Sequence, residues 1–367
     1  MKMKAEQLIK KYAGENSISD IGICSAEDFE GIRAELEKSA DILKGFVEKD
    51  IQKRISPRMS MEGAKSIIAA AVSYNRDCCF EIDDEIRGYI SMGAAGEDYH
   101  LYMMRLLNGL AEILRQKYGA ECRCFTDTGP LCDRAVALRA GIGYIGKNGC
   151  VIAKNGGAAV FLGYIITDME LEKSSKSKDT CGSCKNCLKS CPTGAISDKG
   201  FKTEKCISFL TQIKRPLTDR EILSIGLNLY GCDKCQRACM KNMPAENEVE
   251  DIDAAMPKIK DIIEMSNREF KETYGKTAIG WRGAAVIKRN ALCALLRYRG
   301  EKAMEIACGA LKSENKLVRQ TAAQVIGLMG GGKNGLDALI NAEKNEKDTD
   351  IILVYRDIIE RLKGAGS

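Results

Sequence analysis

The chain of 367 residues has one histidine, His100, one tryptophan and only 6 prolines. With a single histidine, neither a histidine-rich zinc site nor a Ser-His-Asp triad away from His100 can form. No apolar run approaches the roughly 18 residues of a membrane-spanning helix. The N-terminal segment MKMKAEQLIKKYAGE also lacks the apolar stretch and cleavage site of a signal peptide. We therefore expect a cytoplasmic protein that does not bind a membrane.

The chain also lacks a strong excess of either charge, because its formal net charge is only +5. Such a mild excess permits a polyanionic partner without requiring one. Cysteine, in contrast, is abundant, with 17 residues. In a reducing compartment this number favours a metal or redox role over a disulfide framework.

The first cysteine run, CGSCKNCLKSCP, places Cys181, Cys184, Cys187 and Cys191 at the spacing C-x2-C-x2-C-x3-C-P. This is the ferredoxin pattern, in which three thiolates bind one 4Fe–4S cluster and the fourth ligates a second cluster. A second run should therefore exist.

The second run, YGCDKCQRACMKN, supplies Cys232, Cys235 and Cys239. Leu229 stands where a fourth cysteine is expected, Met240 replaces the usual proline, and Cys206 in TEKCISFLT is the obvious substitute ligand. Crossing the ligands predicts one cluster on Cys181, Cys184, Cys187 and Cys239, and another on Cys191, Cys206, Cys232 and Cys235. Structural zinc sites are the alternative, because CxxC pairs also bind zinc.

Two clusters conduct electrons, so the reaction site must lie elsewhere in the chain. Residues 1–170 alternate patterns typical of buried strands, at 64–74 and 156–167, with a long amphipathic helix at 99–119. This alternation predicts an α/β domain. The polar segment LEKSSKSKD (171–179) reads as a linker, and a ferredoxin-like domain is expected over 180–245.

Residues 278–365 are predicted to be all helical, with short gaps that suggest paired HEAT-like repeats or an ordinary helical bundle. The stretch is basic. Its charges could form a solvated face or contact a phosphate backbone. The residues concerned are Arg282, Lys288, Arg289, Arg297, Arg299 and Arg319.

Several motifs together resemble the epoxyqueuosine reductase family of cobalamin- and iron–sulfur-dependent tRNA-modifying enzymes, over nearly the whole chain. They are RISPRMSMEGAKSII, GEDYH, DTGPLCDRAVALRAGIGYIGKNGCVI, FLGYIITDMEL, CGSCKNCLKSCPTGAI, CISFLT, YGCDKCQ and AIGWRGAAVIKRNALCALL. The resemblance implies reduction of epoxyqueuosine to queuosine at the tRNA wobble position, by a cobalamin that two 4Fe–4S clusters supply with electrons. It also implies a monomer and an external electron donor such as a flavodoxin or ferredoxin.

In the family, the general acid is the aspartate of a D-[ST]-x-P motif, which corresponds to Asp127. The alternative role of Asp127 is that of a turn-former in DTGP. Beside an apolar corrin its carboxyl should lose hydration, so we expect a raised pKa that keeps it protonated. His100 looks a poor proton donor, because nothing in the sequence ties it to a titrating partner.

The family comparison also places Arg54 and Arg134 near the corrin or the substrate. The glycine-rich segment AGIGYIGKNG offers close backbone approach and polar groups for the corrin amides, so Gly143, Lys147 and Asn148 are further candidate contacts. His100 could serve as a lower axial ligand, but the sequence lacks the D-x-H-x-x-G motif of that binding mode.

The sequence departs from the family pattern at Met92, Gly93 and Met240. Two other functions remain open: a related cobalamin and iron–sulfur reductase of a small molecule, and a plain ferredoxin-type electron-transfer protein. The basic helical stretch disfavours the first, and residues 1–170 disfavour the second.

Overall fold

A computed structural model describes residues 3–77, 84–242, 247–248 and 251–365 of the chain. By its internal contacts the chain divides into two compact units. Unit 1 comprises Met1–Asp77, Asp98–Thr203 and Lys234–Asn247, and unit 2 comprises Cys78–Glu97, Glu204–Asp233 and Glu248–Ser367. Among the described residues, none of the helices combines the length and apolarity that crossing a membrane would require.

Unit 1 is built on a four-stranded sheet in which every neighbouring pair is antiparallel, whereas the alternation behind the predicted α/β domain is typical of a parallel sheet. Its strands, in spatial order, are β1 (Asp20–Ser25), β2 (Ser66–Ser73), β8 (Val160–Thr167) and β5 (Cys122–Thr126). The strand predicted at 64–74 is confirmed. The strand predicted at 156–167 begins later, because Gly156 and Gly157 belong to the preceding turn.

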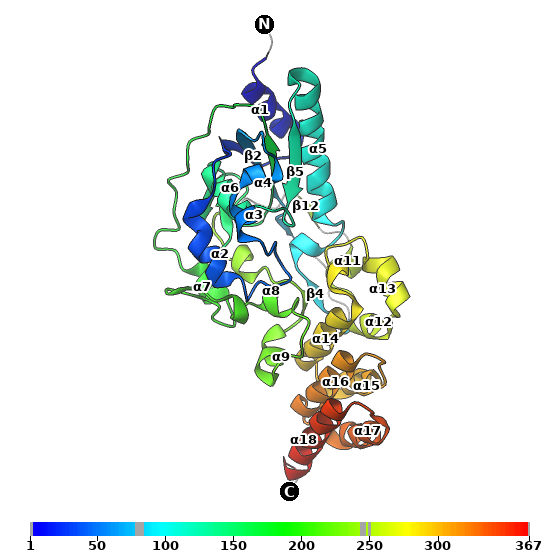
Figure 1. The fold of residues 1–367 in the computed structure, drawn as a ribbon. Coiled ribbons are helices and arrows are strands. Elements are labelled where there is room, and N and C mark those ends of the chain that lie inside the picture. The colour runs from blue at the N-terminus through cyan, green and yellow to red at the C-terminus, as the bar shows by residue number, and fades with distance from the viewer. Residues whose placement is uncertain (1–2, 78–83, 243–246, 249–250, 366–367) are drawn as a thin grey trace. The chain divides into compact units, whose positions relative to one another are not determined.

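The sheet buries both faces, which explains why β2 reads as a continuous apolar run. Ile67, Ala69 and Ala71 pack on the side of α6 (Asp133–Arg139), while Ile68, Ala70 and Val72 pack on the side of α5. Helix α5 (Tyr99–Tyr118) confirms the long amphipathic helix predicted there. Gly119 follows the helix as its C-cap, and its φ of 70° is a conformation that glycine adopts without steric strain. Figure 1 shows α5 running along the sheet.

The other elements of unit 1 are short apart from α1. The helices are α1 (Ala5–Glu15), η1 (Glu30–Ile32), α2 (Arg33–Ser39), α3 (Ile51–Ile55), α4 (Pro57–Ser60), α7 (Asn186–Ser190) and α10 (Lys234–Arg237). The strands are β3 (Arg76–Asp77), the hairpin β6 (Gly143–Ile145) and β7 (Val151–Ala153), and the pair β9 (Ile196–Ser197) and β10 (Gly200–Phe201). Two more short elements are η3 (Thr203–Lys205) and β12 (Asn247–Glu248).

The segment 171–179, predicted to be a linker, packs against the sheet of unit 1. The Ser174 amide donates to the Ile23 carbonyl, and the Ile23 amide donates to the Ser174 hydroxyl. The Leu171 side chain is buried and its amide donates to Ser66. These bonds fix the chain just before the first cysteine run, so this polar segment is an ordered part of unit 1.

Unit 2 is mainly helical. Its elements are β4 (Tyr89–Ile90), η2 (Met92–Ala94), α8 (Ile207–Leu210), α9 (Asp219–Ile225), β11 (Asn228–Tyr230), α11 (Ile252–Ala255), α12 (Ile259–Glu264), α13 (Asn267–Tyr274), η4 (Gly280–Arg282), α14 (Ala284–Ala294), η5 (Leu295–Arg297), α15 (Gly300–Ala310), α16 (Lys316–Leu328), α17 (Gly332–Asn345) and α18 (Thr349–Ala365). Within it α14 packs on α16 and α16 on α18, while α15 packs on α17. The helices therefore form two stacked rows, and the prediction that 278–365 is all helical is confirmed (Figure 1).

One predicted phosphate contact in this region is wrong. The Arg289 side chain is 0% exposed, and it donates to the carbonyls of Leu210, Ile213 and Arg215. Its neighbour Asn290 donates to the carbonyls of Thr211 and Leu229. Arg289 therefore cannot contact a phosphate, because its guanidinium is used to brace the backbone of unit 2.

The remaining basic residues of the region differ in whether their side chains are exposed or make contacts within the protein. Arg282 is buried, Lys288 donates to the Met265 carbonyl, and Arg319 is paired with Glu346 at 2.6 Å. Arg297 and Arg299 are exposed. A contact with a polyanion therefore remains open chiefly to these last two cations of the predicted set.

Candidate functional site

Asp127 lies in unit 1, directly after the last residue of β5, in the turn that leads to α6. Its φ of 49° places its backbone in the left-handed region that residues other than glycine rarely adopt. Its side chain is 60% exposed, so the carboxyl is accessible to a bound molecule. The turn therefore places an exposed carboxyl group directly after the C-terminal end of β5.

His100, at the start of α5, connects Asp127 to a second carboxylate. Its Nδ1 lies 2.7 Å from Oδ1 of Asp98, the N-cap residue of the helix, and its Nε2 lies 3.3 Å from Oδ2 of Asp127. The prediction that His100 has no titrating partner is wrong. Asp98 is two residues away, but Asp127 is brought to the ring only by the packing of β5 beside α5.

The pKa values of this triad shift in the directions expected of an ion pair. Partial burial acts to raise the pKa of Asp127, but the close contact with His100, a hydrogen bond from Tyr99 and the charge of His100 together lower it below its ordinary value. Burial acts to lower the pKa of His100, but Asp127 and Asp98 outweigh it and raise that pKa. The expected raised pKa of Asp127 is therefore corrected, because an imidazolium stabilises its carboxylate.

Aromatic rings hold the histidine in place. The ring of Tyr99 stacks on His100 with centroids 4.1 Å apart, and on Phe161 of β8 with centroids 4.5 Å apart. The hydroxyl of Tyr99 forms a hydrogen bond with Asp127. Tyr99 and His100 are therefore site residues to which the sequence reading assigned no catalytic role, although GEDYH was noted as a motif.

Arg54 and Asp133 form the inner side of the site. Arg54, in α3, is 9% exposed, and its guanidinium donates no hydrogen bond to any residue that the structure describes. Its charge acts on Asp133, the first residue of α6. Five N–H donors thus remain for a group that is not part of the described chain.

The other predicted cobalamin contacts are engaged within the protein. Arg134 donates to the Gly149 carbonyl, Lys147 donates to the carbonyls of Gly182 and Cys184, and Asn148 accepts from the Cys150 amide. At Gly143 a Cβ atom would lie 1.9 Å from the Ile152 carbonyl oxygen, so the β6–β7 hairpin itself requires this glycine. Lys147 connects that hairpin to the first cysteine run.

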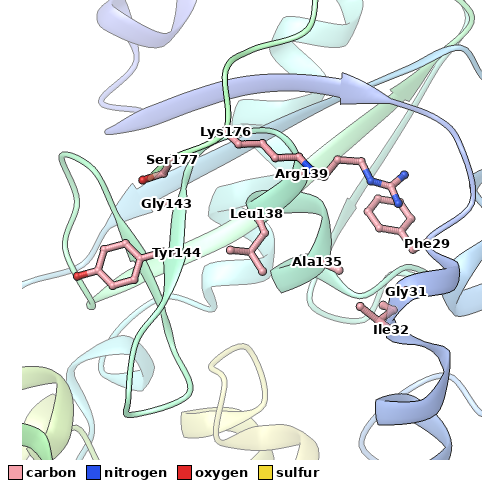
Figure 2. Close-up of a pocket in the computed structure, with 10 residues that line it drawn as sticks. All are labelled: Phe29, Gly31, Ile32, Ala135, Leu138, Arg139, Gly143, Tyr144, Lys176 and Ser177. Carbon is pink, nitrogen blue, oxygen red and sulfur yellow. The ribbon is translucent and has the colours of Figure 1, made fainter. Parts of the chain in front are cut away.

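Gly143 also borders a hollow of about 320 Å³ in unit 1. Figure 2 shows its lining, which includes Phe29, Leu138, Arg139 and Tyr144. The Arg139 guanidinium lies 3.3 Å from the centre of the Phe29 ring and donates to the Asp28 carbonyl. It is therefore held by contacts within the protein. Neither Asp127 nor His100 is among the described residues that line this hollow.

The four thiols of the first predicted cluster lie together in unit 1. Burial and then the charges of Cys181 and Cys184 raise the pKa of Cys187, and the same two charges add to burial in raising the pKa of Cys239. The Tyr144 hydroxyl also lies beside Cys181. Cys239 thus lies near the first run although it is distant in sequence, and the crossed ligand set stays a prediction.

The second predicted set is divided between the two units, and each half is held together within its own unit. In unit 1, the Ser190 hydroxyl donates to the Lys234 carbonyl, which pairs the segments carrying Cys191 and Cys235. The segments carrying Cys206 and Cys232 lie in unit 2.

In unit 2, the Gly231 amide donates to the Thr211 hydroxyl, which joins the segments of Cys206 and Cys232. Met92 is buried in this unit, and its amide donates to Asp233. In the described part of the chain, no three Cys, His, Asp or Glu side chains converge in a way that could hold a single metal ion.

Comparison with known proteins decides between the interpretations of these two centres. A family model described as "Epoxyqueuosine reductase QueG, DUF1730" matches residues 54–128, the range that contains Arg54, His100 and Asp127. A model described as "4Fe-4S double cluster binding domain" matches residues 180–242. The epoxyqueuosine reductase of Bacillus subtilis (strain 168) is 37% identical over 98% of this chain and 96% of its own length.

The chain belongs to the epoxyqueuosine reductase family. The enzyme of the same name from Staphylococcus aureus is likewise 37% identical, over 94% of each chain. The iron–sulfur match favours clusters over the zinc alternative at the cysteine runs.

Solved structures of epoxyqueuosine reductases share the fold. One, crystallised with an epoxyqueuosine-modified tRNA-Tyr stem loop, has a TM-score of 0.90 and 34% identity over 98% of this chain and 100% of its own. Another, from Bacillus subtilis, has a TM-score of 0.88 with the same identity and coverage, and shows a catalytic aspartate loop swung out of the active site. In that relative, the catalytic loop therefore adopts a position outside the active site.

Proposed function

We propose that this protein reduces epoxyqueuosine to queuosine at the wobble position of tRNA, with Asp127 as the general acid. The observation that carries this proposal is the chain of contacts from Asp98 through His100 to Asp127. The family model over 54–128 and the relatives' names support the substrate.

The reaction requires protons, and this chain of contacts can supply them. Conversion of an epoxide to an alkene consumes two electrons and two protons and releases the oxygen as water. His100, held protonated beside Asp98 and Asp127, passes its proton to the Asp127 carboxylate, which gives it to the epoxide oxygen as the C–O bond breaks. The second proton comes from solvent, which reprotonates His100, and it reaches the departing hydroxide through Asp127 so that water is released.

The exposed position of Asp127 fits this role better than a buried one. A group that must donate to a large substrate has to be accessible, and the 60% exposure of its side chain permits this. Because its pKa is lowered, Asp127 rests as a carboxylate and takes up its proton from His100, whose raised pKa favours the protonated imidazole. Docking of substrate and cofactor then excludes water from the pair and strengthens their interaction.

Cobalamin is the cofactor that we infer, and the donor chemistry of Arg54 fits it. The guanidinium is almost buried and donates to no described residue, so it can bind an amide or phosphate oxygen of the cofactor. Cobalamin, when bound, supplies the electron pair for cleavage of the C–O bond. Gly143, Lys147, Asn148 and Arg134 shape the β6–β7 hairpin beside it.

Two 4Fe–4S clusters on the crossed ligand sets complete the proposed assembly and relay single electrons from an external donor, such as a flavodoxin or ferredoxin. In this proposal residues 1–170 form the α/β cobalamin-binding domain and 180–245 the ferredoxin-like domain. Residues 278–365 are HEAT-like repeats that hold the tRNA, a reading that the two stacked helical rows support. We infer a cytoplasmic monomer.

The test is reconstitution under anaerobic conditions, followed by three measurements on one sample. Iron and sulfide should each approach about eight per chain, as two 4Fe–4S clusters require. Added cobalamin should shift its absorbance spectrum on binding, and a tRNA that carries epoxyqueuosine should lose the epoxide oxygen. Bound clusters without turnover of the tRNA would favour the electron-transfer alternative.

A further inference from the structure

Asp127 adopts its left-handed backbone conformation in contact with a second carboxylate. Its amide donates to Oδ2 of Asp133 at 2.6 Å, across the turn that precedes α6. Among the described residues this is the hydrogen bond made by the backbone of Asp127. A non-glycine residue in this conformation costs about 1–2 kcal/mol, so a specific contact has to compensate.

The rest of the turn is fixed independently at its two ends. Before Asp127, the Thr126 hydroxyl donates to the Leu162 carbonyl at 2.7 Å. After it, the Leu131 amide donates to the Tyr164 hydroxyl at 3.0 Å. Between these anchors, the Thr128 amide donates to the Thr126 carbonyl and closes a tight turn around Asp127, and Asp133 holds the Asp127 amide itself.

Asp133 lies in the first turn of α6, where a carboxylate stabilises the helix, but its carboxyl is only partly satisfied. Its Oδ1 is buried and has no hydrogen-bond partner among the residues that the structure describes. Burial first and then the charge of Asp127 raise the pKa of Asp133 to about 7, although the Asp127 amide, Arg54 and His100 oppose this shift. Tyr164 faces the same carboxyl. A half-satisfied buried carboxyl is costly, so its contact with the turn carries a function.

We propose that Asp133 is a positioning residue, which latches the amide of Asp127 and thereby directs the Asp127 carboxyl toward His100 and the substrate. This inference rests on the proposed role of Asp127 as general acid. Without the latch, the peptide relaxes to an ordinary backbone conformation, and the carboxyl leaves Nε2 of His100. Asp133 itself transfers no proton to the substrate.

The latch is tested with two variants and a matched control. Asp133→Ala removes the acceptor, whereas Asp133→Asn keeps an oxygen that can accept from the Asp127 amide. Asp168→Ala is the control, because the Asp168 carboxylate likewise accepts a backbone amide, that of Glu121, at the other end of β5. Each protein is measured by single-turnover reduction of epoxyqueuosine tRNA and by hydrogen exchange of a peptide covering 126–131.

We expect Asp133→Ala to slow the single-turnover rate by about 10- to 100-fold, the range for losing a hydrogen bond to a charged group. Its tRNA affinity should stay unchanged, and exchange at the Asp127 amide should accelerate. Asp133→Asn should restore both slow exchange and most of the rate, and Asp168→Ala should match the unaltered protein.

Two results would overturn the latch. One is an unchanged rate and unchanged exchange in Asp133→Ala. The other is a slow Asp133→Asn variant that keeps its exchange protection, which would assign Asp133 a charge or proton role instead. If the unaltered protein fails to reduce the tRNA, the proposed function fails, but hydrogen exchange still decides whether the latch exists.

Discussion

Asp127 owes its chemistry to three neighbours, of which two are adjacent residues far before it in the sequence and the third follows it closely. His100 forms the ion pair, Tyr99 donates to the carboxylate, and Asp133 holds the backbone. The sequence predicted the aspartate through its motif. It could not predict the ion pair, because the two residues meet only when β5 packs beside α5.

The first test at this scale is Asp127→Asn. Asparagine keeps the size of the side chain but carries no transferable proton, so turnover should fall by about 10²–10⁴-fold, the usual contribution of a general acid. Single-turnover rates, cluster content and cobalamin binding should be measured in the same sample. Asp168→Asn serves as the matched control. Loss of cobalamin binding in the Asp127 variant would instead make this residue a cofactor ligand.

His100→Asn should change the dependence of stability on pH. Because the pKa of His100 is raised in the folded protein, its stabilising effect is complete below its unfolded pKa of about 6.5 and is lost as pH rises through the folded value. Asp127, whose pKa is lowered, contributes above about pH 3.9. The variant should therefore have a lower Tm than the unaltered protein near pH 5.5 and a nearly equal Tm near pH 9. Equal melting temperatures at both pH values would contradict the ion pair.

At the scale of elements, the apolar periodicity predicted correctly those helices and strands whose burial pattern is contained in one segment. The helix at α5 and the strand at β2 are clear because their apolar spacing matches their burial. The linker at 171–179 and the surface position of Arg289 were wrong, because composition says nothing about partners far away in the sequence. A polar segment can be ordered by backbone bonds, and an arginine can be buried among carbonyls.

Arg289→Met tests the brace that α14 makes within unit 2. The guanidinium remains charged at neutral pH, since burial lowers its pKa only to about 10. Its removal leaves the buried carbonyls of Leu210 and Ile213 and the partly buried carbonyl of Arg215 without this donor, and each unsatisfied buried group costs about 1–3 kcal/mol. Denaturant unfolding should show a loss of about 3 kcal/mol or more, and the iron content should fall because the segments of Cys206 and Cys232 loosen.

The matched control for Arg289 is Arg297→Met, which removes an exposed guanidinium three residues after α14 ends. A surface substitution of this kind should change the free energy of unfolding by no more than about 0.5 kcal/mol. Equal losses in the two variants would show that the buried network contributes little.

For the whole molecule, the proposed RNA contact depends on cations that remain exposed. Reversing Arg297 and Arg299 to glutamate should weaken tRNA binding, and each lost phosphate contact should reduce the slope of log affinity against log salt by about one. Reversing Lys10 and Lys11 in α1 changes the net charge equally and is the control. If both pairs lower affinity to the same extent, the effect is one of net charge and not of a defined surface.

For the whole molecule, the sequence predicted correctly those functional features that have a recognisable motif. The spacing of the cysteines predicted a double cluster, which the family match over 180–242 supports. The division into three domains stays a prediction, because the compact units follow contacts and not the order of the motifs. Cys206 and Cys232 belong to one unit, and Cys191 and Cys235 to the other.

The central claim is that this chain removes the epoxide oxygen from a tRNA-borne nucleoside with a proton from Asp127. The most direct measurement is mass spectrometry of the nucleosides of an epoxyqueuosine tRNA after one anaerobic turnover with the reconstituted, chemically reduced holoprotein. We expect queuosine, one oxygen atom lighter than its precursor, to appear with the unaltered protein and to form far more slowly with Asp127→Asn. Persistence of epoxyqueuosine with a protein that carries both clusters and cobalamin, or equal rates for the two proteins, would contradict the account.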